Sequence, residues 1–341
     1  MSFKKIWWKN LVFIGILLLL VLFISWIFLP SYNLAPVDVV IPRGADSSEI
    51  AKILFEQGVI KNKFLFVFLS KVLNWEQDLK AGGYEFLASN MIEVLRKLRE
   101  GRIKTYQITI PEGLPRWEVA EILDAKGTVE KDNFLALVDN PGSFKEDFSF
   151  FPSPGSLEGY LYPDTYYFTK EENPQKVVRK FLSRFQEVAL PIYEEGKLKN
   201  SFSLQKVIIL ASIVEKETHI LSEKPIVAAV FYNRLRKGYR LEADPTVKYA
   251  LGNFHKRLTR DELKTPSPYN TYLHYGLPPG PICSPGRDSI YAVLHSADVD
   301  YLYFVAKGDG SHKFSRTYEE HKQAVYKYQK EKTNDSLTSG S

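Results

Sequence analysis

The feature that most constrains this chain is a nearly continuous apolar run, Ile208 to Thr218, which overlaps a longer segment, Leu204 to Glu217, whose pattern predicts a helix. Ser203 precedes it as a possible N-cap, and neither Gly nor Pro breaks it. The segment is almost continuously apolar from Ile208 to Val214 and then carries two glutamates, Glu215 and Glu217. A helix with so broad an apolar surface brings its last acidic residues close to a protein core.

The two glutamates project from opposite faces of this helix. At about 100° per residue, Glu217 lies within about 20° of Leu210 and about 40° of Ile213, whereas Glu215 points nearly the other way. A carboxylate in line with an apolar stripe is partly desolvated, which raises its pKa and keeps it protonated near neutrality. Such a group is suited to general acid catalysis. The alternative is a buried structural glutamate bonded to a lysine or to backbone, and helix geometry alone does not decide between the two.

Composition limits the classes of protein that remain. With 341 residues, 45% of them hydrophobic and 25% charged, the chain is an ordinary globular sequence long enough for two domains. The net charge of +5 forms no basic stripe, so a nucleic-acid partner is not expected. The single cysteine, Cys283, excludes an internal disulfide and is expected to pack in a Pro/Gly-rich loop. No cofactor is expected. His312 and His321 could bind metal in principle, but no HExxH or paired-Cys pattern accompanies them, so packing or substrate contact is favoured and no metal site is predicted.

The N-terminal region predicts a membrane anchor. Residues 11–29 contain no charge and are long enough to cross a bilayer as a helix. Lysines precede this run within residues 1–10 and no cation follows until Arg43, which predicts a cytoplasmic N-terminus and an extracytoplasmic remainder. The run is longer than a signal-peptide core and lacks a good cleavage site, so an uncleaved single-pass anchor in the cell membrane is expected.

A weak internal repeat follows the anchor. Ile41-Pro42-Arg43-Gly44 is matched 69 residues later by Ile110-Pro111-Glu112-Gly113, and Gly58 is matched by Gly127. Each copy predicts a short strand, a Pro-Gly turn and a helix that ends at glycine. Together with an amphipathic helix from Met91 to Leu98, the two copies predict a small α+β module over residues 37–140.

A larger mixed α+β domain is predicted over residues 157–330. Its expected helices cover residues 174–196, 203–221, 223–237 and 317–330, with short strands near residues 301–306 and 312–314. Residues 331–341 lack apolar periodicity and are expected to form a disordered tail. The predicted fold class is therefore α+β, with an anchor, a small module and a larger domain.

Six motifs in this domain occur in the order typical of one family. They are Ala211-Ser212-Ile213-Val214-Glu215-Lys216-Glu217-Thr218, Phe231-Tyr232-Asn233-Arg234-Leu235, Asp244-Pro245-Thr246-Val247, Tyr269-Asn270-Thr271-Tyr272, Gly276-Leu277-Pro278-Pro279-Gly280-Pro281-Ile282, and Tyr301-Leu302-Tyr303-Phe304-Val305-Ala306 through His312-Lys313-Phe314. The chain resembles the YceG-like (MltG) family of endolytic murein transglycosylases over nearly its whole length. This resemblance implies that the module at residues 37–140 is LysM-like and that residues 157–330 are catalytic.

The resemblance implies cleavage within nascent peptidoglycan strands between N-acetylmuramic acid and N-acetylglucosamine. The products would carry 1,6-anhydromuramyl ends, and elongation would stop. The family's catalytic glutamate aligns with Glu217. Peptidoglycan strands would be the substrate, with peptidoglycan synthases or division proteins as further partners.

Further residues are expected to form the sugar cleft. Asn233, Asp244, Tyr269 and Asn270 would line it, orient the acetamido group or stabilise positive charge in the transition state, and Glu158 is a further candidate. One departure from the family pattern is Glu242, where Gln is usual; we do not count Glu242 as catalytic on that basis.

Two other functions remain open from the sequence. A muramidase-type hydrolase would use Glu217 with a second carboxylate, Asp244 or Glu158, and would leave a reducing end. A membrane-tethered, non-catalytic wall-binding scaffold would use Glu217 only as a buried structural acid.

Overall fold

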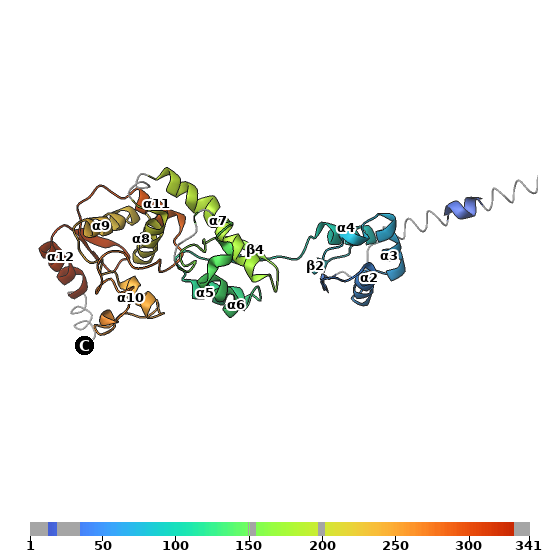
Figure 1. Ribbon diagram of the computed structural model, residues 1–341, viewed down its shortest axis with the longest axis horizontal. Coiled ribbons are helices and arrows are strands. Elements are labelled where there is room, and N and C mark those ends of the chain that lie inside the picture. The colour runs from blue at the N-terminus through green and yellow to red at the C-terminus, as the bar shows by residue number, and fades with distance from the viewer. Residues whose placement is uncertain (1–12, 19–34, 149, 151–154, 197–201, 331–341) are drawn as a thin grey trace, which may run out of the picture. The chain divides into compact units, whose positions relative to one another are not determined.

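A computed structural model describes residues 13–18, 35–148, 150, 155–196 and 202–330 (Figure 1). The chain divides into two compact units, one up to Tyr106 and one from Gln107. The sequence places the end of the first module near residue 140, whereas the structure divides the chain 34 residues earlier. The reason is that residues 108–138 contribute their apolar side chains to the core of the second unit, as Ile108 and Phe134 do.

Most of the N-terminal prediction concerns residues outside the described part of the chain. Of the predicted anchor at residues 11–29, the structure describes a helical stretch at residues 13–18. Among the described residues, no helix combines the length and the apolar character needed to span a bilayer. Residues 1–10 and the predicted tail at residues 331–341 also lie outside the described residues.

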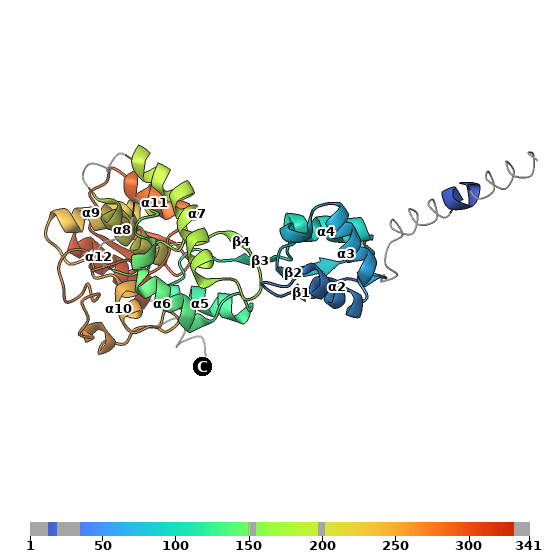
Figure 2. The same cartoon turned by 45° about the vertical axis from the view of Figure 1, so that its right-hand side comes forward.

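Within residues 35–106, the first unit contains a two-stranded antiparallel sheet and three α-helices (Figure 2). Val39 of one strand lies opposite Tyr84 of the other, and both are buried. Asp46, Asn62 and Asn90 cap the three helices through their side-chain oxygens, which is why each helix begins where it does. The elements are β1 (Val37–Ile41), α2 (Ser47–Glu56), α3 (Lys63–Val72), a 3₁₀ turn (Glu76–Asp78), β2 (Gly82–Phe86) and α4 (Met91–Glu100).

The internal repeat is confirmed by the backbone. Gly44 and Gly113 have φ angles of 82° and 78°, and Gly58 and Gly127 have φ angles of 70° and 66°. These left-handed conformations favour glycine, so each copy turns and ends its helix by the same means. One copy begins the first unit and the other begins the second.

The N-terminal half of the second unit packs aromatic side chains between short helices and a two-stranded sheet. Phe181 and Phe185 of the long helix α7 contact Tyr166 and Tyr160 with ring centroids 4.5 and 4.9 Å apart. The elements are β3 (Tyr106–Thr109), α5 (Arg116–Ala125), α6 (Lys131–Asp139), a 3₁₀ turn (Pro141–Phe144), β4 (Thr165–Phe168) and α7 (Pro174–Glu195).

Helix α8 (Leu204–Glu217) is the core element of the second unit, as its sequence predicts. All its residues from Val207 to Glu215 are buried, and it packs against α9, α10 and α11. Cys283 is also buried and donates from Sγ to the Ser212 carbonyl at 3.3 Å, which confirms its packing role. The helix ends at Glu217 because Thr218 is extended.

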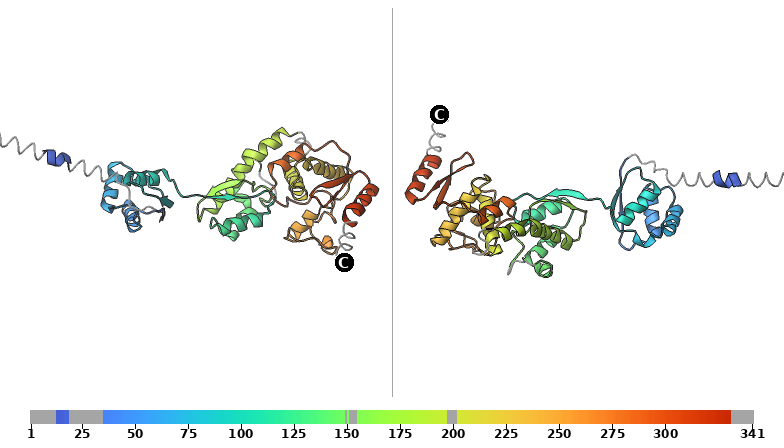
Figure 3. Two further views of the ribbon diagram at one scale, coloured as in Figure 1. Left: turned by 180° about the vertical axis from the view of Figure 1, so that it is seen from behind. Right: turned by 90° about the horizontal axis from the view of Figure 1, so that it is seen from above.

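The remaining elements surround α8 and bear out the predicted α+β class. The hairpin β5–β6 and helix α12 lie side by side (Figure 3). The helix predicted at residues 317–330 is α-helical only to Val325 and then continues as a π-helical turn. These elements are α9 (Lys224–Arg236), α10 (Asp244–Ala250), a 3₁₀ turn (Glu262–Lys264), α11 (Arg287–Leu294), β5 (Tyr303–Ala306), β6 (His312–Ser315), α12 (Tyr318–Val325) and the π-helical turn (Tyr326–Lys330).

Candidate active site

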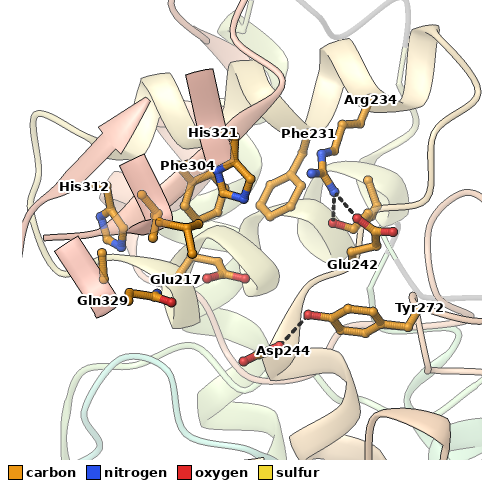
Figure 4. Close-up of a pocket in the computed structure, with 14 residues that line it drawn as sticks. Glu217, Phe231, Arg234, Glu242, Asp244, Tyr272, Phe304, His312, His321 and Gln329 are labelled. Atoms are coloured by element: carbon orange, nitrogen blue, oxygen red, sulfur yellow. Dashed lines mark hydrogen bonds and ion pairs between the residues drawn. The ribbon is translucent and has the colours of Figure 1, made fainter. Parts of the chain in front are cut away.

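A pocket of about 380 Å³ opens at the C-terminal end of α8 (Figure 4). Side chains from α8, α9, α10, the β5–β6 hairpin and the C-terminal helix line it, so residues far apart in the sequence meet here. They are Glu217, Phe231, Arg234, Leu241, Glu242, Asp244, Tyr272, Phe304, Val305, Ala306, His312, His321, Val325 and Gln329.

Glu217 is the last residue of α8 and is half-buried at this pocket. Burial, together with the negative charge of Asp244, raises the pKa of its carboxyl to about 8. No hydrogen bond or ion pair holds this carboxyl within the part of the chain that the structure describes. Glu217 is therefore protonated near neutrality, as the position of Glu217 on its helix face predicts. Its proton is available to a ligand in the pocket.

Glu215 performs the structural role that the sequence left open for Glu217. Its carboxylate forms a buried ion pair with Lys224, whose Nζ lies 3.1 and 3.2 Å from the two oxygens. It also accepts hydrogen bonds from the Gly286 amide at 3.1 Å and the Ser289 hydroxyl at 2.6 Å. Glu215 thus joins α8 to the starts of α9 and α11, while Glu217 faces the pocket.

Asp244 brings a second carboxylate into the pocket. It occupies the first turn of α10 but does not cap it, since the N-cap position belongs to Ala243 and Asp244 accepts no hydrogen bond from a helix amide in the described residues. Its Oδ1 instead accepts a hydrogen bond from the Tyr272 hydroxyl at 2.6 Å. Tyr272 therefore orients a charge that faces Glu217 across the pocket.

Arg234 and Glu242 form one wall of the pocket. The buried Arg234 guanidinium donates to the carbonyls of Leu302 at 2.7 Å and Leu241 at 2.9 Å, and so ties α9 to two loops. It also donates to Glu242 Oε2 at 3.2 Å. Glu242 has a φ angle of +48°, a strained backbone conformation for a residue with a side chain.

Two histidines line the same pocket, and their Nδ1 atoms differ in hydrogen bonding. His312 Nδ1 lies 2.7 Å from Glu223 Oε2, and its backbone amide donates to Glu223 Oε1 at 2.9 Å. His321 stacks on Tyr303, and its buried Nδ1 has no partner among the described residues. Burial lowers the pKa of His321, which favours its neutral form. Among the described residues, no group of three His, Cys, Asp or Glu side chains could hold a metal ion.

Asn233 and Asn270 do not line this pocket. Asn233 donates from Nδ2 to the carbonyls of Val299 at 2.8 Å and Tyr301 at 3.0 Å, which holds the loop before β5 against α9. Asn270 is fully buried and donates to the carbonyls of Leu263 and Thr265. Both amides serve loop structure in this conformation.

Tyr269 and Glu158 also lie away from the pocket lining. Tyr269 packs on Tyr249, with ring centroids 4.8 Å apart. Glu158 is buried and accepts hydrogen bonds from Arg116 and from the Tyr249 hydroxyl at 3.1 Å. Burial raises the pKa of Glu158 to about 7. Of the predicted site residues, the structure therefore brings together Glu217 and Asp244.

The sequence predictions did not assign site roles to Arg234, Tyr272 or Glu223. Arg234 and Tyr272 stand within motifs that carry the family resemblance, next to or near Asn233 and Asn270. Their position in these motifs is a signal that could have identified them. A motif that holds a segment near the site can present either face of that segment to the pocket, so the neighbours of Asn233 and Asn270 are candidates as well. Glu223 had no signal of this kind, since its partner His312 is 89 residues away.

A protonated carboxylic acid and an oriented carboxylate in one open, polar pocket define a candidate acid–base site. This arrangement can protonate a leaving oxygen and stabilise developing positive charge, as enzymes that cleave glycosidic bonds require.

Comparison with known proteins identifies the family. The YceG-like family model matches residues 39–327, so the chain belongs to the YceG-like family. It is 33% identical over 305 residues to a Bacillus subtilis protein named endolytic murein transglycosylase, covering 86% of this chain and 84% of that protein. A Streptococcus pneumoniae (strain D39) protein of the same name is 30% identical over 87% of this chain, which spans 59% of that protein's length. A crystal structure of a yceG-like protein from Listeria monocytogenes matches with a TM-score of 0.60 and 34% identity, covering 85% of this chain and 99% of that one.

Proposed function

We propose that this protein is an endolytic murein transglycosylase that cleaves peptidoglycan strands between N-acetylmuramic acid and N-acetylglucosamine. The observation that carries the proposal is Glu217, a carboxyl with a pKa of about 8 in an open pocket. The relatives' shared name supports the substrate class.

Glu217 first donates its proton to the glycosidic oxygen, so that the bond to the muramyl C1 breaks. The muramyl 6-hydroxyl oxygen then attacks C1 from within the same sugar and closes a 1,6-anhydro ring. The hydroxyl proton passes to the Glu217 carboxylate, which restores the acid. Asp244, oriented by Tyr272, stabilises positive charge at C1 and favours the protonated form of Glu217.

A muramidase-type hydrolase is the second candidate. The specific observation in its favour is that Asp244 shares the pocket with Glu217 and is held by a 2.6 Å hydrogen bond. In that reaction Asp244 would act as nucleophile or activate water, and the product would carry a reducing end.

The same proposal extends to the rest of the chain. The uncharged run at residues 11–29 would anchor the protein in the cell membrane, with residues 1–10 cytoplasmic and the catalytic unit outside. The strand–helix–helix–strand order of β1, α2, α3 and β2 supports a LysM-like module that binds peptidoglycan. Peptidoglycan synthases or division proteins would be its neighbours at the membrane.

The test is mass spectrometry of products formed from uncrosslinked glycan strands by the purified chain from residue 37 onward. The Glu217→Gln variant serves as the matched control, because it keeps the shape of the side chain and removes the acid. Internal fragments one water lighter than hydrolysis products, absent with the variant, are expected.

The other outcomes separate the alternatives. Fragments with reducing ends would show that the protein is a hydrolase and not a transglycosylase. Asp244 would then be the next residue to vary. If the folded wild-type chain, supplied with its membrane segment in detergent, binds strands but does not cut them, the protein is a wall-binding scaffold.

A further inference from the structure

His312 is a pocket residue that the proposed mechanism leaves unused. It begins β6, lines the pocket with Glu217 and is almost fully buried, with 10% of its side chain exposed. Phe304 meets its ring edge-on with centroids 5.4 Å apart, and Phe314 lies at 6.3 Å. These contacts fix the plane of the imidazole.

Glu223 fixes the tautomer of His312. Its two oxygens accept from the His312 backbone amide and face Nδ1, at 2.9 and 2.7 Å. Burial acts to raise the pKa of Glu223, but the hydrogen bonds from His312 outweigh it and the pKa is lowered, so this carboxylate is ionised and only accepts. Nδ1 therefore carries the proton, and Nε2 is the ring nitrogen left for a ligand in the pocket.

A short loop between α8 and α9 links Glu217 to the His312–Glu223 pair. Glu217 is the last residue of α8 and Glu223 is the N-cap residue of α9, so the two carboxylates flank this loop. The Thr218 hydroxyl also reaches Glu223, at 3.4 Å. The loop thus joins the helix that ends in the acid to the helix whose N-cap residue supports His312, and both Glu217 and His312 line the pocket.

An imidazole with a carboxylate behind Nδ1 is a well-supported proton acceptor, because the carboxylate holds the tautomer and stabilises the imidazolium that forms. We propose that His312, positioned by Glu223, is a further catalytic residue that accepts the proton of the muramyl 6-hydroxyl at Nε2. This inference rests on the proposed transglycosylase function and divides its acid and base between two groups.

The 6-hydroxyl proton moves to Nε2 while the O6 electron pair forms the bond to C1. The bond from C1 to the glycosidic oxygen breaks, and that oxygen takes the proton of Glu217. The His312 imidazolium then releases its proton to solvent and the Glu217 carboxylate takes one up, so both groups return to their starting states.

The decisive variant is His312→Asn, because the asparagine amide lies where Nδ1 was and keeps the hydrogen bond to Glu223 while Nε2 is lost. His295→Asn is the matched control, since His295 is not among the residues that line the pocket. We expect kcat for anhydro-product formation to fall by about 10²-fold or more in His312→Asn with KM little changed, and neither to change in His295→Asn.

Two further measurements separate catalysis from structure. Added imidazole should restore part of the activity of His312→Ala, whereas it would not repair a misfolded protein. Glu223→Gln should lower kcat, and its effect should be far from additive with His312→Ala. If His312→Asn does not fold, the imidazole rescue of His312→Ala and the kcat of Glu223→Gln decide the question.

The inference is overturned if folded His312→Asn keeps the wild-type kcat, or if it raises KM alone, which would make His312 a binding contact. It is equally overturned if imidazole fails to rescue His312→Ala and Glu223→Gln retains full kcat. Failure of the proposed function has a different signature, since the wild-type chain would then form no anhydro ends.

Discussion

Glu215 and Glu217 stand two residues apart on α8 and perform opposite tasks. Glu215→Gln leaves Lys224 without its buried partner, and breaking such a pair costs about 3–5 kcal/mol of unfolding free energy. Glu217→Gln removes the acid from an open pocket, so it should lower kcat by at least about 10²-fold and leave stability near the wild-type value.

Urea denaturation and product formation, measured on both variants, check this contrast. Equal loss of stability in the two variants would show that Glu217 is a structural acid, as the scaffold function requires. The two proteins serve as each other's control, because each carries the same chemical change on the same helix.

The pH dependence of the reaction follows from the raised pKa of Glu217. The acid must be protonated, so activity should decline as the pH rises through about 8. The charge of Asp244 contributes to that raised value, and Asp244→Asn should therefore move the alkaline limb of kcat/KM to lower pH. A pH–rate profile of both proteins measures the shift. An alkaline limb that stays in place would mean that Asp244 does not act on Glu217.

At this scale the sequence predicts Glu217 and Asp244 as site residues, and the structure places both at one pocket, while their chemical roles stay predictions. It could not separate Asn233 and Asn270 from pocket residues. An asparagine that bonds backbone carbonyls and an asparagine that faces a ligand are the same residue in the sequence. Only the fold decides which partners lie near its amide. His312 and Glu223 illustrate the same limit, because their contact spans 89 residues.

At the scale of elements, Gly159 shows how tightly α8 is packed. A Cβ at this position would lie 2.5 Å from Pro281 Cβ and 3.0 Å from Ile208 Cγ2. Gly159→Ala should therefore destabilise the second unit by about 1–3 kcal/mol through overpacking, beyond the cost of its φ of +84°.

Gly276→Ala isolates the steric part of that effect. Gly276 has nearly the same φ, +83°, but a Cβ there would meet nothing within 4 Å. Thermal unfolding of the two variants should show the larger loss for Gly159→Ala. Equal losses would indicate that backbone strain, and not contact with Pro281 and α8, dominates at both sites.

Most helices of the second unit could be predicted because their starts and ends are local signals. Ser203 caps α8, and Pro174 begins α7 in the first turn. The boundary between the units is different in kind. It depends on which core the apolar residues 108–138 join, and that choice is made by contacts with α7 and its neighbours far along the chain.

At the scale of the whole molecule, the two units have separate hydrophobic cores. Phe66 is fully buried in one and Phe181 in the other. Each Phe→Ala change removes a large core side chain and should cost about 3–5 kcal/mol. Calorimetry should show two transitions, with Phe66→Ala lowering one and Phe181→Ala lowering the other.

Catalysis gives a second readout of the same experiment. At a temperature where the first unit of Phe66→Ala is unfolded, cleavage of short, soluble glycan fragments should continue, because every residue of the pocket belongs to the second unit. A single shared transition, or loss of this activity with the first unit, would contradict the independence of the two cores.

The lone cysteine beside α8 offers a natural reporter of motion. Cys283 is buried, and burial raises the pKa of its thiol well above the usual value, so a thiol reagent reacts with it only when the surrounding core opens. The Ser212 carbonyl that accepts its hydrogen bond belongs to the same helix that ends in Glu217. The rate of labelling therefore reports how often the core around α8 opens. A bound glycan strand that stabilises this core would slow the labelling reaction, and no engineered probe is needed to measure it.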